Sequence, residues 1–253
     1  MNDDKPLITR NQAIFLAHQS KKRKQETKAK KNFLIREIII VVLTFTIFYI
    51  IANYPAFSAI TNYWFNKPQP VVKTVTPEPT PIPTPTPEPT PEPVVTPSTI
   101  TIPKIGIEAP IIWDINFDAI RENLNEGVVQ YVESAYPGQI GNMFIVGHSS
   151  DYVWSKGKYK SIFALLPKLT NGDQIIISYK GKEYIYETFN YKIVAPTDIS
   201  VIEPTDNAIV TLMTCWPIGT SQKRYIVQAK LISPKPSGEQ TTYPSILGLP
   251  KTR

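Results

Sequence analysis

The chain has 253 residues, enough for one medium-sized domain with additional segments. Its net charge of +6 is unevenly distributed: residues 1–32 hold nine Lys or Arg against three Asp or Glu, whereas residues 68–253 hold 16 against 17. A nucleic-acid-binding domain carries a basic face. Because the basic character belongs to the N-terminal tail, composition excludes a nucleic-acid partner for the part that folds.

A basic tail and an apolar stretch open the chain. Residues 1–32 form the tail, and residues 33–60 read "FLIREIIIVVLTFTIFYIIANYPAFSAI". No residue from Ile38 to Ala52 is charged, and the flanking apolar residues bring the stretch to the roughly 20 that a membrane-spanning helix needs. The positive-inside rule then keeps the tail in the cytoplasm and places the rest of the chain outside the cell. We expect a single-pass anchor in the cell membrane. The alternative is a cleaved signal peptide, with "AFS" at 56–58 as the cleavage site.

A proline-rich linker follows at residues 61–97. Twelve of the thirty residues from 68 to 97 are proline, mostly alternating with Thr or Glu. Proline has no backbone N–H, so this composition disfavours both helix and sheet. It predicts an extended extracellular spacer that rises about 3 Å per residue and could hold a domain up to roughly 90 Å from the membrane.

Residues 98–232 consist of short β-like runs, and residues 233–253 form a polar tail that we expect to be flexible. The strand-like runs approach eight over roughly 135 residues, with one or two short helices at most. This pattern predicts an all-β, closed or nearly closed barrel rather than alternating strand–helix–strand units. The main strands are expected at 99–107, 142–149, 174–180, 182–194, 208–215 and 224–232, and helical spacing occurs at 117–124 and 159–169.

Cys215 is the only cysteine, and it ends the apolar run "AIVTLMTC". In an exported chain a cysteine without a partner points to a reactive thiol. The alternative is a buried cysteine that packs as a small hydrophobic residue. Because Trp216 and Pro217 follow and proline stops a strand ladder, we expect the thiol at the rim of the barrel.

His148 is the candidate base for this thiol. The chain has two histidines, and His18 lies in the basic tail, across the membrane in the expected topology. A thiol needs a base or a positive neighbour to become a good nucleophile at neutral pH. Arg224 opens the strand after Cys215, where a guanidinium could hold a substrate carbonyl or an oxyanion. Ordinary surface positions are the alternative for both residues. Arg121, the other arginine of residues 98–232, is interpreted as a solvated residue of a helix face.

These residues carry a resemblance to a known family. His148 in "VGHSS", the run "TLMTC" at 211–215 and Arg224 in "KRYIVQA" resemble the sortase family of cysteine transpeptidases, over about residues 98–232. The resemblance implies a closed eight-stranded β-barrel, with Cys215, His148 and Arg224 as catalytic residues and Thr214 lining the substrate site. It implies cleavage of an LPXTG-like sorting signal after Thr. The acyl group then passes to an amine of a cell-wall precursor or of another surface protein.

Several points stay open at this level. The alternatives are a non-enzymatic surface module on a stalk, with Cys215 in its core, or another type of exported cysteine peptidase. No cofactor and no metal site is expected from the residue pattern. The final residues "LPKTR", Leu249–Arg253, read like the donor signal itself, and one hypothesis is that they occupy the donor groove weakly as a pseudo-substrate.

Overall fold

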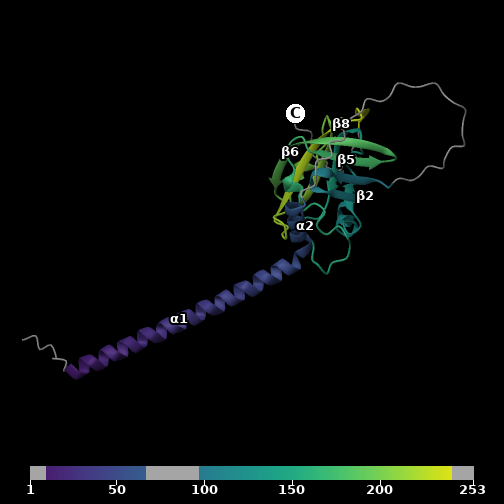
Figure 1. The fold of residues 1–253 in the computed structure, drawn as a ribbon. Helices are drawn as coiled ribbons and strands as arrows, with labels where there is room; N and C mark the ends of the chain where they lie inside the picture. Colours follow the sequence, from purple (N-terminus) through teal and green to yellow (C-terminus); the bar gives the residue numbers. More distant parts are fainter. Residues whose placement is uncertain (1–9, 67–96, 241–253) are drawn as a thin grey trace, which may run out of the picture. The chain divides into compact units, whose positions relative to one another are not determined.

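The computed structural model describes residues 10–66 and 97–240 (Figure 1). The chain divides after Ala52 into two compact units. The first nine residues, nearly all of the expected spacer and the "LPKTR" motif lie outside the described residues.

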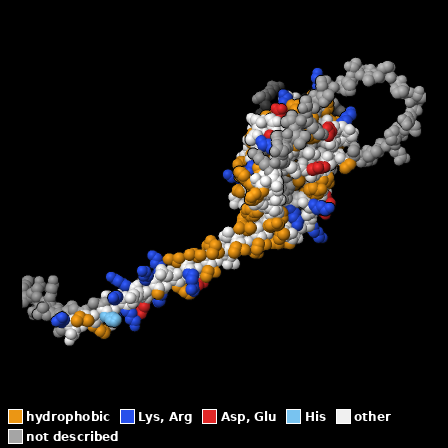
Figure 2. All heavy atoms as spheres, in the orientation of Figure 1, with side chains coloured by type: hydrophobic (Ala, Val, Ile, Leu, Met, Phe, Trp, Pro, Cys, Tyr) orange, Lys and Arg blue, Asp and Glu red, His pale blue; other side chains and the backbone are white. Residues whose placement is uncertain are grey.

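The first unit is one long helix, α1 (Arg10–Ala52). Figure 2 shows Lys and Arg side chains gathered along its N-terminal half and hydrophobic side chains along the half that ends at Ala52. The segment Ile14–Ala52 is long and apolar enough to cross a membrane, by length and composition. A signal sequence meets the same criteria, so both alternatives of the sequence analysis are compatible with this helix.

The second unit begins with a separate helix, α2 (Tyr54–Phe65). The sequence analysis had divided these residues between the anchor (33–60) and the linker (61–97). Pro55 explains the break, because proline disrupts a helix interior but is well suited to a first turn. The helix packs on the barrel: Ser161 Oγ donates to the Pro55 carbonyl at 3.1 Å, and Lys168 Nζ lies 5.1 Å from the centroid of the Trp64 ring.

The rest of the unit is a closed β-barrel of eight strands, as predicted (Figure 1). Its strands lie in the order β3-β2-β1-β5-β6-β8-β7-β4, and pairing of β3 with β4 closes the cylinder. The strands are β1 (Thr99–Ile102), β2 (Ile107–Ile115), β3 (Val128–Tyr131), β4 (Gln139–Val146), β5 (Gln174–Tyr179), β6 (Lys182–Val194), β7 (Ala208–Trp216) and β8 (Lys223–Ser233).

A short ninth strand, β9 (Ser237–Gln240), adds to the outside of this ring. It pairs with β4 in parallel, with Ser237 opposite Gln139. The sequence analysis expected flexible chain from residue 233 onward, whereas the structure extends β8 to Ser233 and places β9 within that range. The polar sequence of β9 gives no alternating apolar pattern from which this pairing could be expected.

Strand β4 ends in a continuous apolar run, residues 143–146, because this part is buried on both faces. Met143 and Ile145 point into the barrel interior, whereas Phe144 and Val146 belong to a second, smaller apolar cluster. Successive side chains of a strand point to opposite faces, so two buried faces require a continuous apolar run. The barrel interior is filled from most strands; its fully buried members include Ile100, Val128, Ile145, Ile177, Val210, Leu212 and Val227.

Helices are few in this unit. The predicted helix at 117–124 forms η2 (Phe117–Ala119) followed by α3 (Ile120–Asn123). The helical spacing at 159–169 instead produces turns that end in η3 (Leu166–Lys168). Pro167 explains this difference, because it cannot donate to a continued helix. The apolar spacing still predicts burial, since Leu165, Leu166 and Leu169 are all buried. Two further short turns are η1 (Pro103–Ile105) and η4 (Ile199–Val201).

Candidate active site

Two adjacent parallel strands bring the candidate nucleophile and its candidate base to one end of the barrel. Each residue of β7 lies opposite the β4 residue 67 positions earlier, from Gly141 and Ala208 to Val146 and Met213. Cys215 follows His148 by the same 67 positions. Because parallel strands end at the same edge of a sheet, extending this register by two residues places His148 beside Cys215.

The turn that carries His148 is held by two hydrogen bonds and by close packing of Gly147 against Phe163. Thr214 Oγ1 donates to the Gly147 carbonyl at 2.8 Å, and Phe163 donates its backbone N–H to the His148 carbonyl at 2.9 Å. A side chain at position 147 would collide with three ring carbons of Phe163, so only glycine fits there. The close approach of the Phe163 ring is therefore the reason for glycine at this position.

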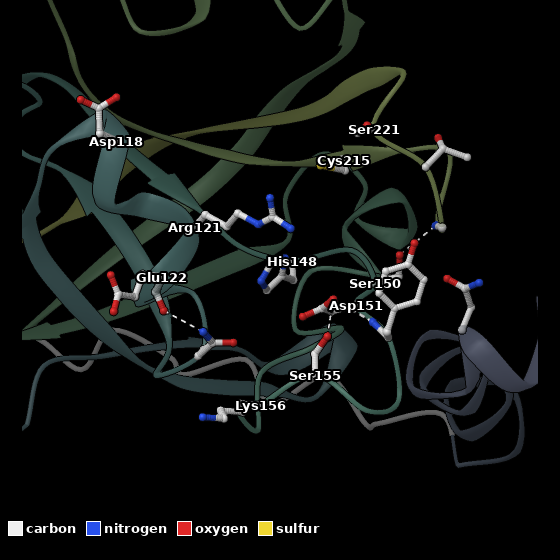
Figure 3. Close-up of a pocket in the computed structure, with 15 residues that line it drawn as sticks. Asp118, Arg121, Glu122, His148, Ser150, Asp151, Ser155, Lys156, Cys215 and Ser221 are labelled. Carbon is white, nitrogen blue, oxygen red and sulfur yellow. Dashed lines mark hydrogen bonds between the residues drawn. The ribbon is translucent and has the colours of Figure 1, made fainter.

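Cys215 lies near the end of β7 and is half-buried, so its thiol is neither a core group nor fully exposed. It lines a cavity of about 840 Å³ that His148 also lines. Figure 3 shows the two side chains on the same cavity, with the Arg121 guanidinium reaching into the space between them. The other lining residues are Asn53, Asp118, Glu122, Asn125, Ser150, Asp151, Tyr152, Ser155, Lys156, Gly219, Thr220 and Ser221.

Two loops frame the mouth of this cavity. The loop after His148 is organised by Asp151, whose Oδ1 accepts from the Tyr152 backbone N–H at 2.8 Å and from Ser155 Oγ at 2.9 Å. Ser150 Oγ accepts from the backbone N–H of Gly219 at 2.9 Å, which ties this loop to the β7–β8 loop. The segments that follow His148 and Cys215 are therefore joined directly.

The surroundings of His148 lower its pKa from the ordinary value of 6.5. Burial is the largest cause, because it disfavours the charged imidazolium. The Asp151 carboxylate acts in the opposite direction, and the Arg121 guanidinium lowers the pKa further. At neutral pH, His148 is therefore mostly in the neutral form, which can accept a proton.

Arg224 lies directly opposite Cys215 in the β7–β8 ladder. Its Nη1 donates to the carbonyls of Ser221 at 2.9 Å and Lys223 at 3.1 Å, within its own hairpin. Arg224 does not belong to the set that lines the cavity, although its position is next to the thiol. Thr214 is buried, and its hydroxyl donates to the Gly147 carbonyl rather than pointing into the cavity.

Arg121, which the sequence analysis interpreted as a solvated residue of a helix face, is exposed on α3 as expected. The structure adds that it lines the cavity. The only signal in the sequence was scarcity, since residues 98–232 contain just two arginines. In the ranges 10–66 and 97–240, no three His, Cys, Asp or Glu side chains gather so that they could hold a metal ion.

Comparison with known proteins gives a consistent result. A family model described as a sortase domain matches residues 100–232, more than half of the chain. Sortase D of Bacillus subtilis (strain 168) is 30% identical over 138 residues, which cover 53% of this chain and 63% of that protein. Sortase A of Bacillus anthracis is 27% identical over 136 residues, covering 54% and 60%. The chain thus spans less than two thirds of these curated relatives.

Solved sortase structures resemble the same region. The Clostridium perfringens sortase D5 transpeptidase is 29% identical, with a TM-score of 0.45, and the match covers 54% of this chain and 79% of that chain. The family model extends from β1 to β8 and includes both His148 and Cys215. The chain belongs to the sortase family of cysteine transpeptidases.

Proposed function

We propose that this protein is a membrane-anchored transpeptidase. It cleaves an LPXTG-like sorting signal after Thr and joins the resulting acyl group to an amine of the cell wall or of another surface protein. The observation that carries the proposal is the shared cavity of Cys215 and His148, at matching ends of β4 and β7. It argues against the alternative of a core cysteine, because Cys215 is half-buried beside a cavity.

In the first step, the Cys215 sulfur attacks the carbonyl carbon of the donor threonine. A C–S bond forms, and the C–N bond to the following residue breaks. The thiol proton passes to the neutral imidazole of His148, which donates it to the departing amine. The product is a thioester between Cys215 and the donor threonine, together with the released C-terminal fragment.

In the second step, an acceptor amine attacks the thioester carbonyl. The new C–N bond forms while the C–S bond breaks, and His148 takes the proton from the amine and returns it to sulfur. The lowered pKa of His148 supports this step, because the neutral imidazole is the form that accepts a proton.

Arg224 is proposed to stabilise the oxyanion or to hold the donor chain. Its place opposite Cys215 supports this role. Both hydrogen bonds to its own hairpin use Nη1, so Nε and Nη2 remain as donors toward a substrate. Thr214 is proposed to act through Gly147, because its hydroxyl holds the turn before His148 rather than a substrate atom.

The proposed partners are surface proteins that carry the donor signal and amine-bearing acceptors. The proposed location is the cell membrane, with α1 as a single-pass anchor, the N-terminus in the cytoplasm and the barrel outside. The apolar stretch of α1 at residues 33–52 and the basic residues before it support this topology.

The test is to trap the acyl-enzyme. The full chain is incubated with an LPXTG-containing peptide, and its mass is measured with and without an amine acceptor. We expect a mass increase equal to the peptide up to its threonine, located on Cys215 and discharged by the amine. Cys215→Ala should abolish the adduct, and His148→Ala should slow its formation by about 10² or more.

Lys223→Ala serves as the matched control, because Lys223 is an exposed β8 residue outside the cavity. It should form the adduct like the wild type. Adduct formation in the Cys215→Ala protein, or its absence from the wild type with every donor peptide of this class, would contradict the proposed function.

A further inference from the structure

Arg121 lines the cavity and carries a guanidinium group. It lies on α3, between β2 and β3, and its guanidinium reaches toward the space between His148 and Cys215 (Figure 3). Within the described part of the chain, the guanidinium makes neither a hydrogen bond nor an ion pair with another side chain. It is close enough to His148 to affect the pKa of that imidazole. A guanidinium so placed can donate to a bound substrate.

The wall of the cavity around Arg121 is charged. Asp118 and Glu122 lie on the same segment as Arg121, and Asp151 and Lys156 come from the loop after His148. On the side of the β7–β8 loop the lining is neutral, with Gly219, Thr220 and Ser221. Tyr152, from the loop after His148, adds an aromatic ring to the lining.

This composition indicates which substrate the cavity receives. An amine acceptor is polar and must approach Cys215 where His148 can take its proton. The charged groups that line the cavity beside His148 therefore suit a charged acceptor.

We propose that Arg121 selects acceptors whose attacking amine lies next to a free carboxylate. The guanidinium binds the carboxylate through charge-assisted hydrogen bonds, for which its planar fork is well suited. The carboxylates of Asp118, Glu122 and Asp151 attract the ammonium end of the same molecule. This inference rests on the proposed function and adds the chemical class of its acceptor: an amino-acid-type group carrying both charges.

The test compares two small acceptors that differ in one group. Glycine carries a carboxylate beside its amine, and glycinamide carries a neutral amide there. The rate at which each acceptor discharges the preformed acyl-enzyme is measured against its concentration for the wild type and for Arg121→Ala. Comparing the two proteins with each probe separately removes the difference in amine basicity between the probes.

We expect Arg121→Ala to raise the KM for glycine by about ten- to hundredfold, the range for losing hydrogen bonds to a charged group. The KM for glycinamide should change much less. The KM of Arg121→Lys for glycine should lie between those of the wild type and Arg121→Ala, because lysine keeps the positive charge but lacks the planar pair of guanidinium donors. Glu126→Ala, an exposed position near α3 that does not line the cavity, should match the wild type for both acceptors.

Formation of the acyl-enzyme from the donor alone distinguishes failure of the proposed function from failure of the role assigned to Arg121. If Arg121→Ala forms the adduct normally but changes both acceptors equally, the proposed function stands and the assignment of Arg121 is overturned. An unchanged KM for glycine overturns it as well. If the wild type forms no adduct, the proposed function fails, and this inference fails with it.

Discussion

At the scale of single residues, the site depends on opposing influences on one imidazole. Burial and the Arg121 guanidinium favour neutral His148, and the Asp151 carboxylate favours the protonated form. The first step of the proposed reaction delivers a proton through His148, and the second removes one. A pKa below the ordinary value assists the removal and makes the protonated form scarce at neutral pH.

Substitutions at these two neighbours should move the pKa of His148 in opposite directions. Asp151→Asn removes the charge that raises it, so the pKa should fall further below 6.5. Arg121→Ala removes a charge that lowers it, so the pKa should rise. The measurement is an NMR titration of the imidazole signals. The His18→Gln background leaves His148 as the only histidine, because the chain has two.

The asparagine at 151 keeps an oxygen that can accept the loop hydrogen bonds of Tyr152 and Ser155, so the comparison isolates charge. A shift in the same direction for both variants would show that loop structure, rather than charge, controls the titration.

Sequence reasoning found Cys215 and His148 because such residues are scarce: one cysteine, and one histidine outside the basic tail. It could not place Arg121, since whether a residue of a short helix faces solvent or a cavity depends on how that helix packs. The role of Thr214 could not be predicted for a similar reason. Its hydroxyl donates to the Gly147 carbonyl, and this hydrogen bond from β7 to the end of β4 depends on how the two strands pair.

At the scale of elements, the positions of the strands could be predicted from the sequence, but the strand that each one pairs with could not. Apolar runs identified β4, β7 and β8 within a few residues, and Lys180 and Gly181 both adopt positive φ in the turn between β5 and β6. The parallel pairing of β4 with β7 is not encoded in either strand alone. It joins segments 67 residues apart, and only the closure of the barrel specifies it. This pairing brings His148 to Cys215.

Gly147 should be intolerant of any side chain, because the Phe163 ring occupies the space beside its Cα. Gly147→Ala should displace the ring or the turn before His148, lowering the free energy of unfolding by about 1–3 kcal/mol. Acyl-enzyme formation should slow, since the turn carries the imidazole. Denaturant unfolding and adduct formation measure the two effects.

Gly238→Ala is the control for this experiment, because nothing lies within 4 Å of the position that its Cβ would take. Combining Gly147→Ala with Phe163→Leu should cost less than the sum of the two single changes, since the smaller side chain relieves the collision. Strict additivity would mean that Phe163 is not the reason for glycine at this position.

At the scale of the whole molecule, charge and hydropathy divide the chain into regions with different environments. The basic residues lie before the apolar stretch of α1 at residues 33–52, and the barrel region is nearly neutral. Such a distribution orients a membrane protein, because the cytoplasmic flank retains Lys and Arg. It also fits the proposed chemistry, since an enzyme that acts on surface proteins must face the side on which they emerge.

The proposed topology can be tested with single cysteines, because Cys215 is the only one in the chain. In the Cys215→Ser background, Ser221→Cys places a thiol on the exposed β7–β8 loop and Ser20→Cys places one in the basic tail. We expect a membrane-impermeant maleimide to label position 221 in intact cells and position 20 only after permeabilisation. The labelled protein should migrate as the full 28.5 kDa chain, whereas cleavage near residues 56–58 would yield a shorter one and support a signal peptide.

A second test changes the charge of the tail. Replacing Lys21, Lys22, Arg23 and Lys24 with glutamine should reduce the difference in labelling between positions 221 and 20, because it removes charges that hold the tail in the cytoplasm. Labelling of position 20 but not 221 in intact cells would reverse the orientation and place the barrel in the cytoplasm, where it could not meet exported substrates.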